Sequence, residues 1–198
     1  MVERSLRMRL DGVEQERRDL VAAQGGDRQA FGRLVERHFG PLYGLLYRLA
    51  GNPEDAEDLC QEAFVRAWSA LPNLRPESRL APYLAQVGLH LFYDQLRARG
   101  RRPSGVRLDP LIDGGPADEH TPLESLQGRE ADQLLAEALE RLPERLRTAL
   151  VLRVIEGRDY EEIAEITGNT VTTLRTQVHQ ARRMLLRLLA PWLEGEDA

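Results

Sequence analysis

The chain has 198 residues, of which 42% are hydrophobic and 30% charged, a composition that excludes wholesale disorder and allows one large domain or two small ones. Its single cysteine, Cys60, excludes an intrachain disulfide and a multi-cysteine zinc site. No stretch approaches the roughly 18 consecutive apolar residues of a membrane span, and no apolar secretion signal is visible at the N-terminus. We therefore expect a cytoplasmic all-α protein without a metal or cofactor.

Charge divides the chain into two helical blocks and a connector. The net charge is −5, and all 27 basic residues are arginine. Acids outnumber arginine over residues 103–133, whereas the flanking blocks are nearly balanced. Residues 103–122, PSGVRLDPLIDGGPADEHTP, are rich in Pro, Gly and Asp and have no apolar period, which predicts a flexible acidic linker.

Caps and prolines place the helices of the first block. Asp27 is suited to cap a helix, and Pro41 is expected to open a second one over 42–50, which Gly51 ends. Pro53 opens a third helix, and a fourth runs from about 82 to 99. The third helix carries an apolar stripe at helical spacing: Ala56, Leu59, Cys60, Ala63, Phe64, Ala67 and Trp68. Residues 1–16 are open to three interpretations: a small amphipathic helix, a disordered arm or a misplaced start site.

The second block has the pattern of a helix-turn-helix. After a helix near residue 134, Pro143 opens another that Gly157 ends. Asp159 then caps a short helix, with Glu162 as its capping-box partner. A tight turn over 167–170 leads to a long helix from Val171 to about Ala190, and this order is typical of a DNA-binding motif.

The long last helix has two contrasting faces. No acid lies between Glu165 and Glu194. The expected apolar face comprises Val171, Leu174, Val178, Ala181 and Leu185, and the N-terminal part of the opposite face carries hydrogen-bonding groups. A helix that enters the major groove needs such groups near its N-terminus, so this pattern favours DNA binding over a solvated arginine face.

Three segments together resemble the extracytoplasmic-function (ECF) sigma factors of bacterial RNA polymerase. They are LVAAQGGDRQAFGRLVERHFGPLYGLLYRLAGNPEDAEDLCQEAFVRAW, YDQLRARGRR and ALERLPERLRTALVLRVIEGRDYEEIAEITGNTVTTLRTQVHQARR. The resemblance implies two small helical domains and no catalysis. We therefore expect an N-terminal extension at 1–16, a sigma-2-like domain at 17–102, a linker at 103–129, a sigma-4-like domain at 130–190 and a tail at 191–198.

The resemblance also implies partners and site residues. The partners are core RNA polymerase, through its beta-prime clamp helices and beta flap, and promoter DNA, with nucleoid association when polymerase is bound. An anti-sigma factor is a further candidate partner. The polar face of the third helix would dock on the clamp helices through Asp55, Asp58, Gln61 and Glu62. Spacing of i, i+3 and i+7 puts Asp55, Asp58 and Glu62 on one face.

DNA contacts are implied on two helices. The fourth helix would face the minus-10 element through Tyr83, His90, Arg97, Arg99, Arg101 and Arg102, with Asp94 orienting Arg97 or a neighbour. A buried core aromatic is the alternative for Tyr83. The last helix would contact the minus-35 element through Thr172, Thr173, Arg175, Thr176, His179, Arg182 and Arg183. The family often has arginine where this chain has Gln177 and Gln180, which predicts weaker nonspecific binding.

Other interpretations stay open. Asp109, Asp113, Asp118 and Glu119 of the linker either mimic RNA in the polymerase channel or only solubilise the chain. A free-standing helix-turn-helix regulator explains the second block but gives the third helix no role. A helical adaptor that binds polymerase or an anti-sigma factor without starting transcripts fits the departures at Tyr83, His90, Gln177 and Gln180. An enzyme is the least favoured class, because no nucleophile–base pair or phosphate-binding glycine loop is present.

Overall fold

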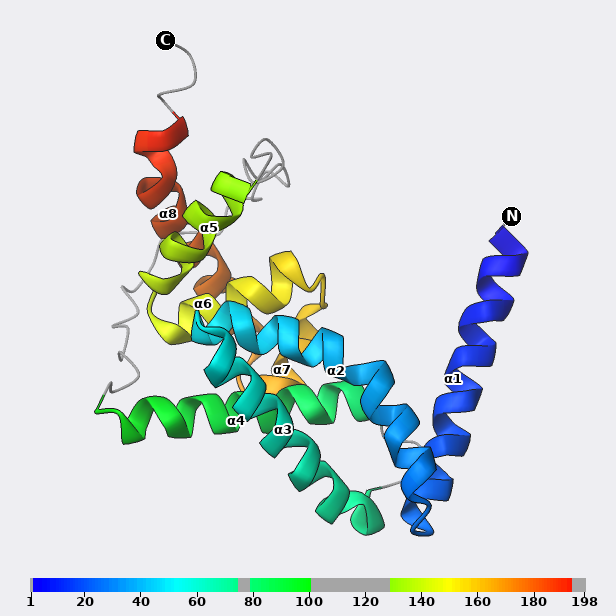
Figure 1. Cartoon of the computed structure of the whole chain (residues 1–198). Coiled ribbons are helices and arrows are strands. Elements are labelled where there is room, and N and C mark those ends of the chain that lie inside the picture. Colours follow the sequence, from blue (N-terminus) through cyan, green and yellow to red (C-terminus); the bar gives the residue numbers. More distant parts are fainter. Residues whose placement is uncertain (1, 75–78, 101–128, 194–198) are drawn as a thin grey trace.

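The protein is described by a computed structural model over residues 2–74, 79–100 and 129–193, with side chains from 12 to 74, 79 to 100 and 133 to 192. Every regular element in these ranges is helical (Figure 1). The first block contains α1 (Val2–Gln24), α2 (Arg28–Ala50), α3 (Pro53–Ala70), the 3-10 turn η1 (Leu71–Asn73) and α4 (Leu80–Ala98). The second contains α5 (Arg129–Glu140), α6 (Glu144–Leu150), the π-helical turn η3 (Val151–Ile155), α7 (Tyr160–Thr167) and α8 (Val171–Leu193).

Helix α1 extends farther than the first-block pattern indicated. It runs without a break through residue 16, so the expected domain start at 17 falls inside it. Of the three interpretations of residues 1–16, the structure supports the helix. Its C-terminal end packs on α2, with Leu20 and Ala23 buried, whereas its N-terminal part stands clear of the other helices (Figure 1).

The predicted caps of the first block are confirmed. The Asp27 carboxylate accepts hydrogen bonds from the backbone N–H groups of Gln29 and Ala30, and Gly51 ends α2 in the left-handed region at φ 75°. Asn52 caps α3 at the Asp55 N–H. The apolar stripe of α3 is buried except for Trp68, which is half-buried.

The prediction that Pro41 starts a new helix is wrong. Helix α2 continues through Pro41 to Ala50. A proline inside a helix removes one backbone hydrogen bond. Leu34 on one side of Pro41 and Leu42 and Leu45 on the other are all buried in the same core, so burial of a single apolar face outweighs that loss.

The second block has the predicted helix-turn-helix order. Asp159 caps α7 by accepting from the Glu162 N–H at 2.7 Å, although the Glu162 carboxylate pairs with Arg79 of the first block instead of completing a capping box. Gly168 ends α7 at φ 71°. The expected helix from 143 to 157 is α6 followed by the π-helical turn.

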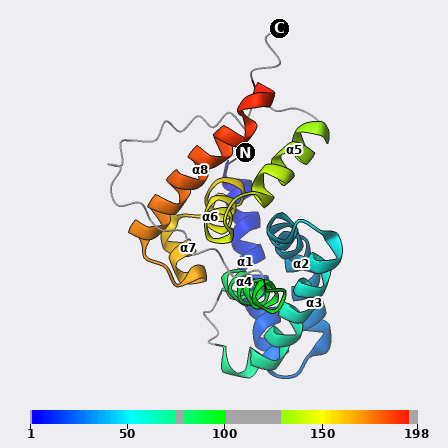
Figure 2. The same cartoon turned by 90° about the vertical axis from the view of Figure 1, so that its left-hand side faces the viewer.

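The two blocks pack against each other. Helix α4 lies along α7, and α2 contacts α5, α6 and η3. Figure 2 shows α5–α8 on one side of the molecule and α2–α4 on the other. The predicted linker lies outside the described residues except for Arg129, which begins α5. The linker acids Asp109, Asp113, Asp118 and Glu119 lie outside them as well.

Candidate interfaces for protein and DNA

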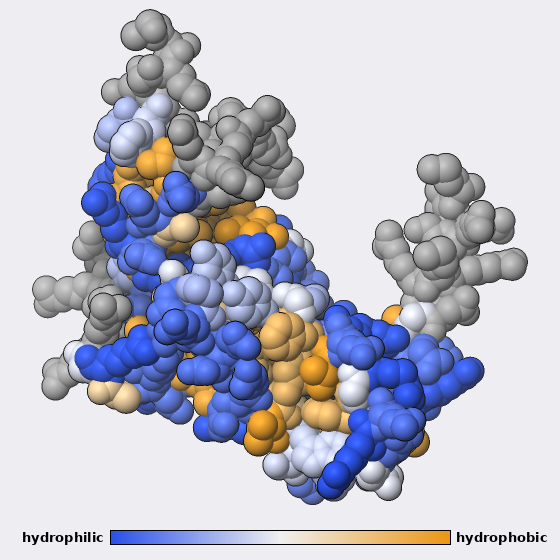
Figure 3. Space-filling model, in the orientation of Figure 1, coloured by the Kyte–Doolittle hydropathy of each residue, from blue (hydrophilic) through white to orange (hydrophobic). Residues whose placement is uncertain are grey.

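The polar face of α3 is exposed as its spacing predicts. Asp58, Gln61 and Glu62 are all exposed, and Glu62 pairs with Arg66 one turn later at 2.9 Å. The α3 helix also borders an apolar band where it meets α2 (Figure 3). That face therefore offers acceptor groups beside apolar surface, the combination that protein partners use.

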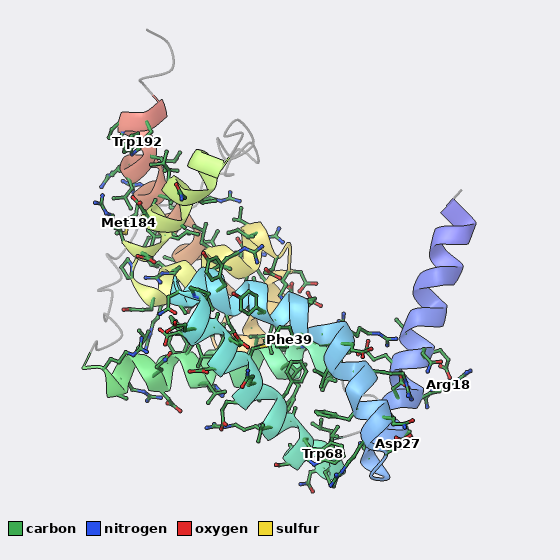
Figure 4. All side chains as sticks on the ribbon, in the orientation of Figure 1. Arg18, Asp27, Phe39, Trp68, Met184 and Trp192 are labelled. Carbon is green, nitrogen blue, oxygen red and sulfur yellow. The ribbon has the colours of Figure 1, made fainter. Side chains whose placement is uncertain are left out.

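Aromatic side chains form that band. Phe39 and Tyr43, one turn apart on α2, stack with ring centroids 6.0 Å apart, and Phe39 stacks on Phe64 of α3 at 6.4 Å. Figure 4 shows Phe39 near the middle of the band and Trp68 toward the end of α3. Val65 of α3, three residues after Glu62, adds apolar surface that is 60% exposed.

Asp55 does not share the exposed face of Asp58, Gln61 and Glu62, although its spacing predicted that it would. It is only 8% exposed and accepts from both terminal nitrogens of Arg99, at 2.6 and 2.7 Å. Gln95 and Asn52 also donate to it. The Arg99 hydrogen bonds lower the pKa of Asp55 despite its burial. Three residues turn a helix by about 300°, so Asp55 is rotated about 60° from Asp58, toward α4.

The basic end of α4 is partly engaged inside the protein. Arg99 ties the end of α4 to α3 through Asp55, and its side chain is still 49% exposed. Arg97 pairs with Asp94, which confirms that Asp94 orients it. Arg101 and Arg102 lie outside the described residues.

Tyr83, His90 and Arg97 share one stripe of α4, which faces the second block. Tyr83 is half-buried beside Glu165 and Ile166 of α7, whereas His90 and Arg97 are exposed. The structure therefore makes Tyr83 neither a fully buried core residue nor a free ring.

Helix α8 carries the predicted two faces. Leu174, Val178, Ala181 and Leu185 are buried, and Val171 is half-buried. Thr172, Arg175, Thr176 and Arg183 are exposed, whereas Thr173, His179 and Arg182 are half-buried. The Thr170 hydroxyl accepts from the Thr173 N–H at 3.2 Å and so caps the helix. The N-terminal part of α8 thus presents hydroxyl and guanidinium groups to solvent.

Gln177 does not belong to that exposed face. It is only 6% exposed, because it lies three residues after Leu174 on the apolar side of α8. The predicted effect of Gln177 on nonspecific DNA binding stays a prediction, for a residue that is buried in this structure. Gln180 is half-buried.

Tyr160 is a site residue that sequence reasoning missed. The Arg175 guanidinium lies over its ring at 5.5 Å from the centroid, and the Arg153 guanidinium lies 4.9 Å from the same centroid. Cation–π contacts of this kind hold a long side chain in one place. Tyr160 opens α7 and Arg175 lies on α8, so only the packing of the two helices reveals the contact.

The described ranges contain neither a cluster of metal ligands nor a membrane-spanning helix. No group of three or more His, Cys, Asp or Glu there could hold a metal ion. No helix there combines the length and apolar character needed to cross a bilayer. The Cys60 thiol is buried, and burial raises its pKa to about 11, so it is a packing residue.

A helical bundle packed on a helix-turn-helix is an architecture that many DNA-binding transcription factors share. Two family models match the chain: Sigma-70 region 2 over residues 34–102 and Sigma-70, region 4, over residues 132–185. The chain belongs to the ECF group of the sigma-70 family, whose members act in promoter-specific transcription initiation through RNA polymerase.

Similar proteins cover nearly the whole chain. The RNA polymerase sigma-H factor of Pseudomonas aeruginosa is 34% identical over 186 residues, 91% of this chain and 96% of that protein. The ECF RNA polymerase sigma-E factor of Escherichia coli K12 is 33% identical over 174 residues, 85% of this chain and 91% of that protein.

Two solved structures have a similar fold. CnrH in complex with the cytosolic domain of CnrY has a TM-score of 0.65 at 26% identity, covering 89% of this chain and 98% of that one. The sigma factor RpoE in complex with the anti-sigma factor NepR from Bartonella quintana has a TM-score of 0.62 at 26% identity, covering 81% of this chain and 96% of that one.

Proposed function

We propose that this sigma factor docks on core RNA polymerase through α3, contacts the minus-10 element through α4 and the minus-35 element through α8, and helps to open the DNA. The observation that carries the proposal is the exposed N-terminal face of α8. It presents Thr172, Arg175 and Thr176 with no acid on the helix, directly after the turn of a helix-turn-helix.

Docking on polymerase is assigned to Asp58, Gln61 and Glu62. These residues are exposed beside the aromatic band of α2 and α3, so apolar contact and specific hydrogen bonds come from one surface. Asp55 supports this surface from inside by fixing the start of α3 to Arg99. The anti-sigma factors in the similar structures make an anti-sigma factor a second candidate partner for this chain.

The minus-10 element is assigned to the α4 stripe of Tyr83, His90 and Arg97. Opened DNA requires aromatic surfaces for unstacked bases and cations for phosphates, and the stripe carries both kinds of group. We also assign phosphate contacts to Arg101 and Arg102, on the basis of the sequence alone.

The minus-35 element is assigned to α8, with Arg175 as the residue that contacts a base edge. Tyr160 fixes the Arg175 guanidinium over its ring, which reduces the side-chain entropy lost when a base is bound. We assign further hydrogen bonds to bases to Thr172, Thr173, Thr176 and His179, and phosphate contacts to Arg182 and Arg183.

Reconstitution with purified core polymerase tests the whole proposal. Co-elution followed by a sequence-restricted run-off transcript from a library of promoter-like duplexes is the expected result. Binding to polymerase with no transcript from any duplex in the library would favour the adaptor. Binding to a palindromic duplex without any association with polymerase would favour the free-standing regulator.

Paired variants test the two assigned surfaces separately. Asp58→Ala with Glu62→Ala is expected to weaken polymerase binding, whereas Glu14→Ala with Glu36→Ala, also exposed acids, is the matched control. Intact polymerase affinity in the first pair would contradict the docking assignment. Arg175→Ala is expected to cost roughly 1–3 kcal/mol of promoter binding and to relax discrimination at one base pair of the minus-35 element. Arg187→Ala, an exposed arginine on the same helix, is the control and should change neither quantity.

A further inference from the structure

A crevice of about 240 Å³, here called the α4–α7 crevice, lies where the C-terminal half of α4 meets α6 and α7 (Figure 2). Leu89 of α4 and Ile166 of α7, each 1% exposed, form an apolar part of its lining. The polar part comes from both helical blocks: α4 contributes His90 and Arg97, and the second block contributes Arg145 and Asn169. Residues far apart in the sequence therefore form one small polar cavity with an apolar wall.

The charges of the α4–α7 crevice have one sign. Among the described residues that line it, Arg97 and Arg145 carry a charge and none is an acid. Arg97 pairs with Asp94 one turn earlier, whereas Arg145 forms no ion pair with any acid in the described part of the chain. Burial raises the pKa of Tyr93, and the Arg145 charge opposes that rise, so the guanidinium lies close to the Tyr93 hydroxyl at the crevice. Both arginines are exposed, so a ligand can reach them from solvent.

The hydrogen-bonding groups of the crevice leave donors unused. The hydroxyls of Tyr93 and Thr167 already donate to other groups of the protein. Asn169 uses its backbone N–H, at 3.3 Å from the Thr167 hydroxyl, but its side-chain amide has no partner within the described ranges. The imidazole of His90 has none there either. A guanidinium, an amide and an imidazole that can all donate are suited to an acceptor-rich anion.

The size of the crevice narrows the class of anion. A volume of about 240 Å³ equals roughly eight water molecules at about 30 Å³ each, which suits a ligand of similar size and is too small for a nucleotide. The fork of N–H groups on a guanidinium matches the oxygens of a phosphate group, and an apolar wall strengthens such bonds by lowering the local dielectric constant. A diphosphate or a short phosphate monoester meets both requirements.

We propose that the α4–α7 crevice binds a small phosphate compound, with Arg145 and Asn169 on one side of the ligand and Arg97 and His90 on the other. The ligand contacts both helical blocks, so its binding stabilises the folded protein. It also occupies two residues that are assigned to the minus-10 element, so it competes with DNA for them. That competition rests on the proposed function, whereas binding of the phosphate compound does not.

Calorimetric titration of the full chain with inorganic pyrophosphate and with glycerol phosphate tests the site. Saturable binding of at least one of them, with a rise in Tm, is the expected result. Arg145→Gln should weaken that binding by about tenfold or more, because it removes a charge-assisted hydrogen bond. Arg141→Gln, an exposed arginine that lines a different cavity, is the matched control and should stay within about twofold of the parent. Saturation by neither compound would overturn the proposal, as would equal losses in the two variants.

Two further titrations test the bridging geometry and the ligand class. Arg97→Gln, on the α4 side of the crevice, should also weaken binding of the phosphate compound, and an unchanged affinity would overturn the bridged arrangement. Succinate, a dicarboxylate of similar size, should bind more weakly, and equal affinity would overturn the assignment to phosphate. Binding of a single-stranded oligonucleotide that depends on Arg145, in a protein that binds neither small phosphate compound, would reassign the crevice to DNA. The small-ligand titrations use neither polymerase nor promoter, so their failure is distinguishable from failure of the proposed function.

Discussion

Replacing Arg147 by methionine would remove a buried donor that three backbone carbonyls share. Arg147 donates to Leu49 at 2.6 Å, Glu140 at 2.7 Å and Leu142 at 3.3 Å, and its bonds to Leu49 and Leu142 are buried. A buried acceptor without a donor costs about 1–3 kcal/mol, and the unbranched methionine chain occupies similar space. Methionine also ends the cost of burying a charge, so we expect a net loss of about 2–4 kcal/mol.

Urea and thermal unfolding followed by circular dichroism measure this loss. For a chain of this size, about 2–4 kcal/mol corresponds to a fall in Tm of roughly 4–16 °C. Arg145→Met, two residues away and exposed, is the control and should stay within about 0.5 kcal/mol of the parent. An Arg147→Met protein as stable as the Arg145→Met protein would refute the reasoning, because the three carbonyls would then have to find water or other donors.

Three further predictions concern acid stability and DNA contacts. The Arg99 hydrogen bonds lower the folded pKa of Asp55 below its usual 3.8, so its contribution is present above about pH 4 and lost as the pH falls through the lowered folded pKa. Asp55→Asn should therefore be less stable at pH 7 and show a flatter acid limb in urea unfolding from pH 7 to 3; an unchanged limb would contradict this. Tyr160→Leu should reduce discrimination among minus-35 variants in a transcription assay. Tyr160→Lys adds a positive charge and should not restore that discrimination. Equal discrimination in Tyr160→Leu and the parent would show that Tyr160 does not position Arg175. Gln177→Arg should destabilise the fold by about 1–3 kcal/mol because it buries a charge. Gln180→Arg should destabilise it less and should steepen the salt dependence of DNA binding. If thermal melts showed Gln180→Arg to be the less stable protein, α8 would present a different face to the core.

Local signals predicted the elements of this protein well. Asp27, Gly51 and Asp159 act through bonds to residues within four positions, so their caps are visible in the sequence. The stripe of α3 is equally local, because a helix period fixes which residues share a face. The failure at Pro41 has the opposite origin: buried leucines on both sides of it, packed on other helices, decide that α2 continues.

Positions at the boundary between two faces were not predictable from spacing alone. Asp55 and Asp58 differ by about 60° on α3, and only the approach of Arg99 from α4 decides that Asp55 is buried. Gln177 has a polar side chain on the apolar side of α8, so its residue type gave no sign that it is buried. Tyr160 and Arg147 act across helices, and no regular spacing links them to Arg175 or Leu49.

Exposed ion pairs and more shielded hydrogen bonds both join the two helical blocks. Arg79 is 75% exposed and Arg48 39% exposed in their side chains, and ion pairs of that kind contribute about 0–1 kcal/mol each and weaken with salt. The Arg147–Leu49 and Tyr93–Thr148 hydrogen bonds are more shielded from that screening. Salt should therefore weaken the ion pairs between the blocks, and it should also weaken the proposed phosphate contacts with DNA.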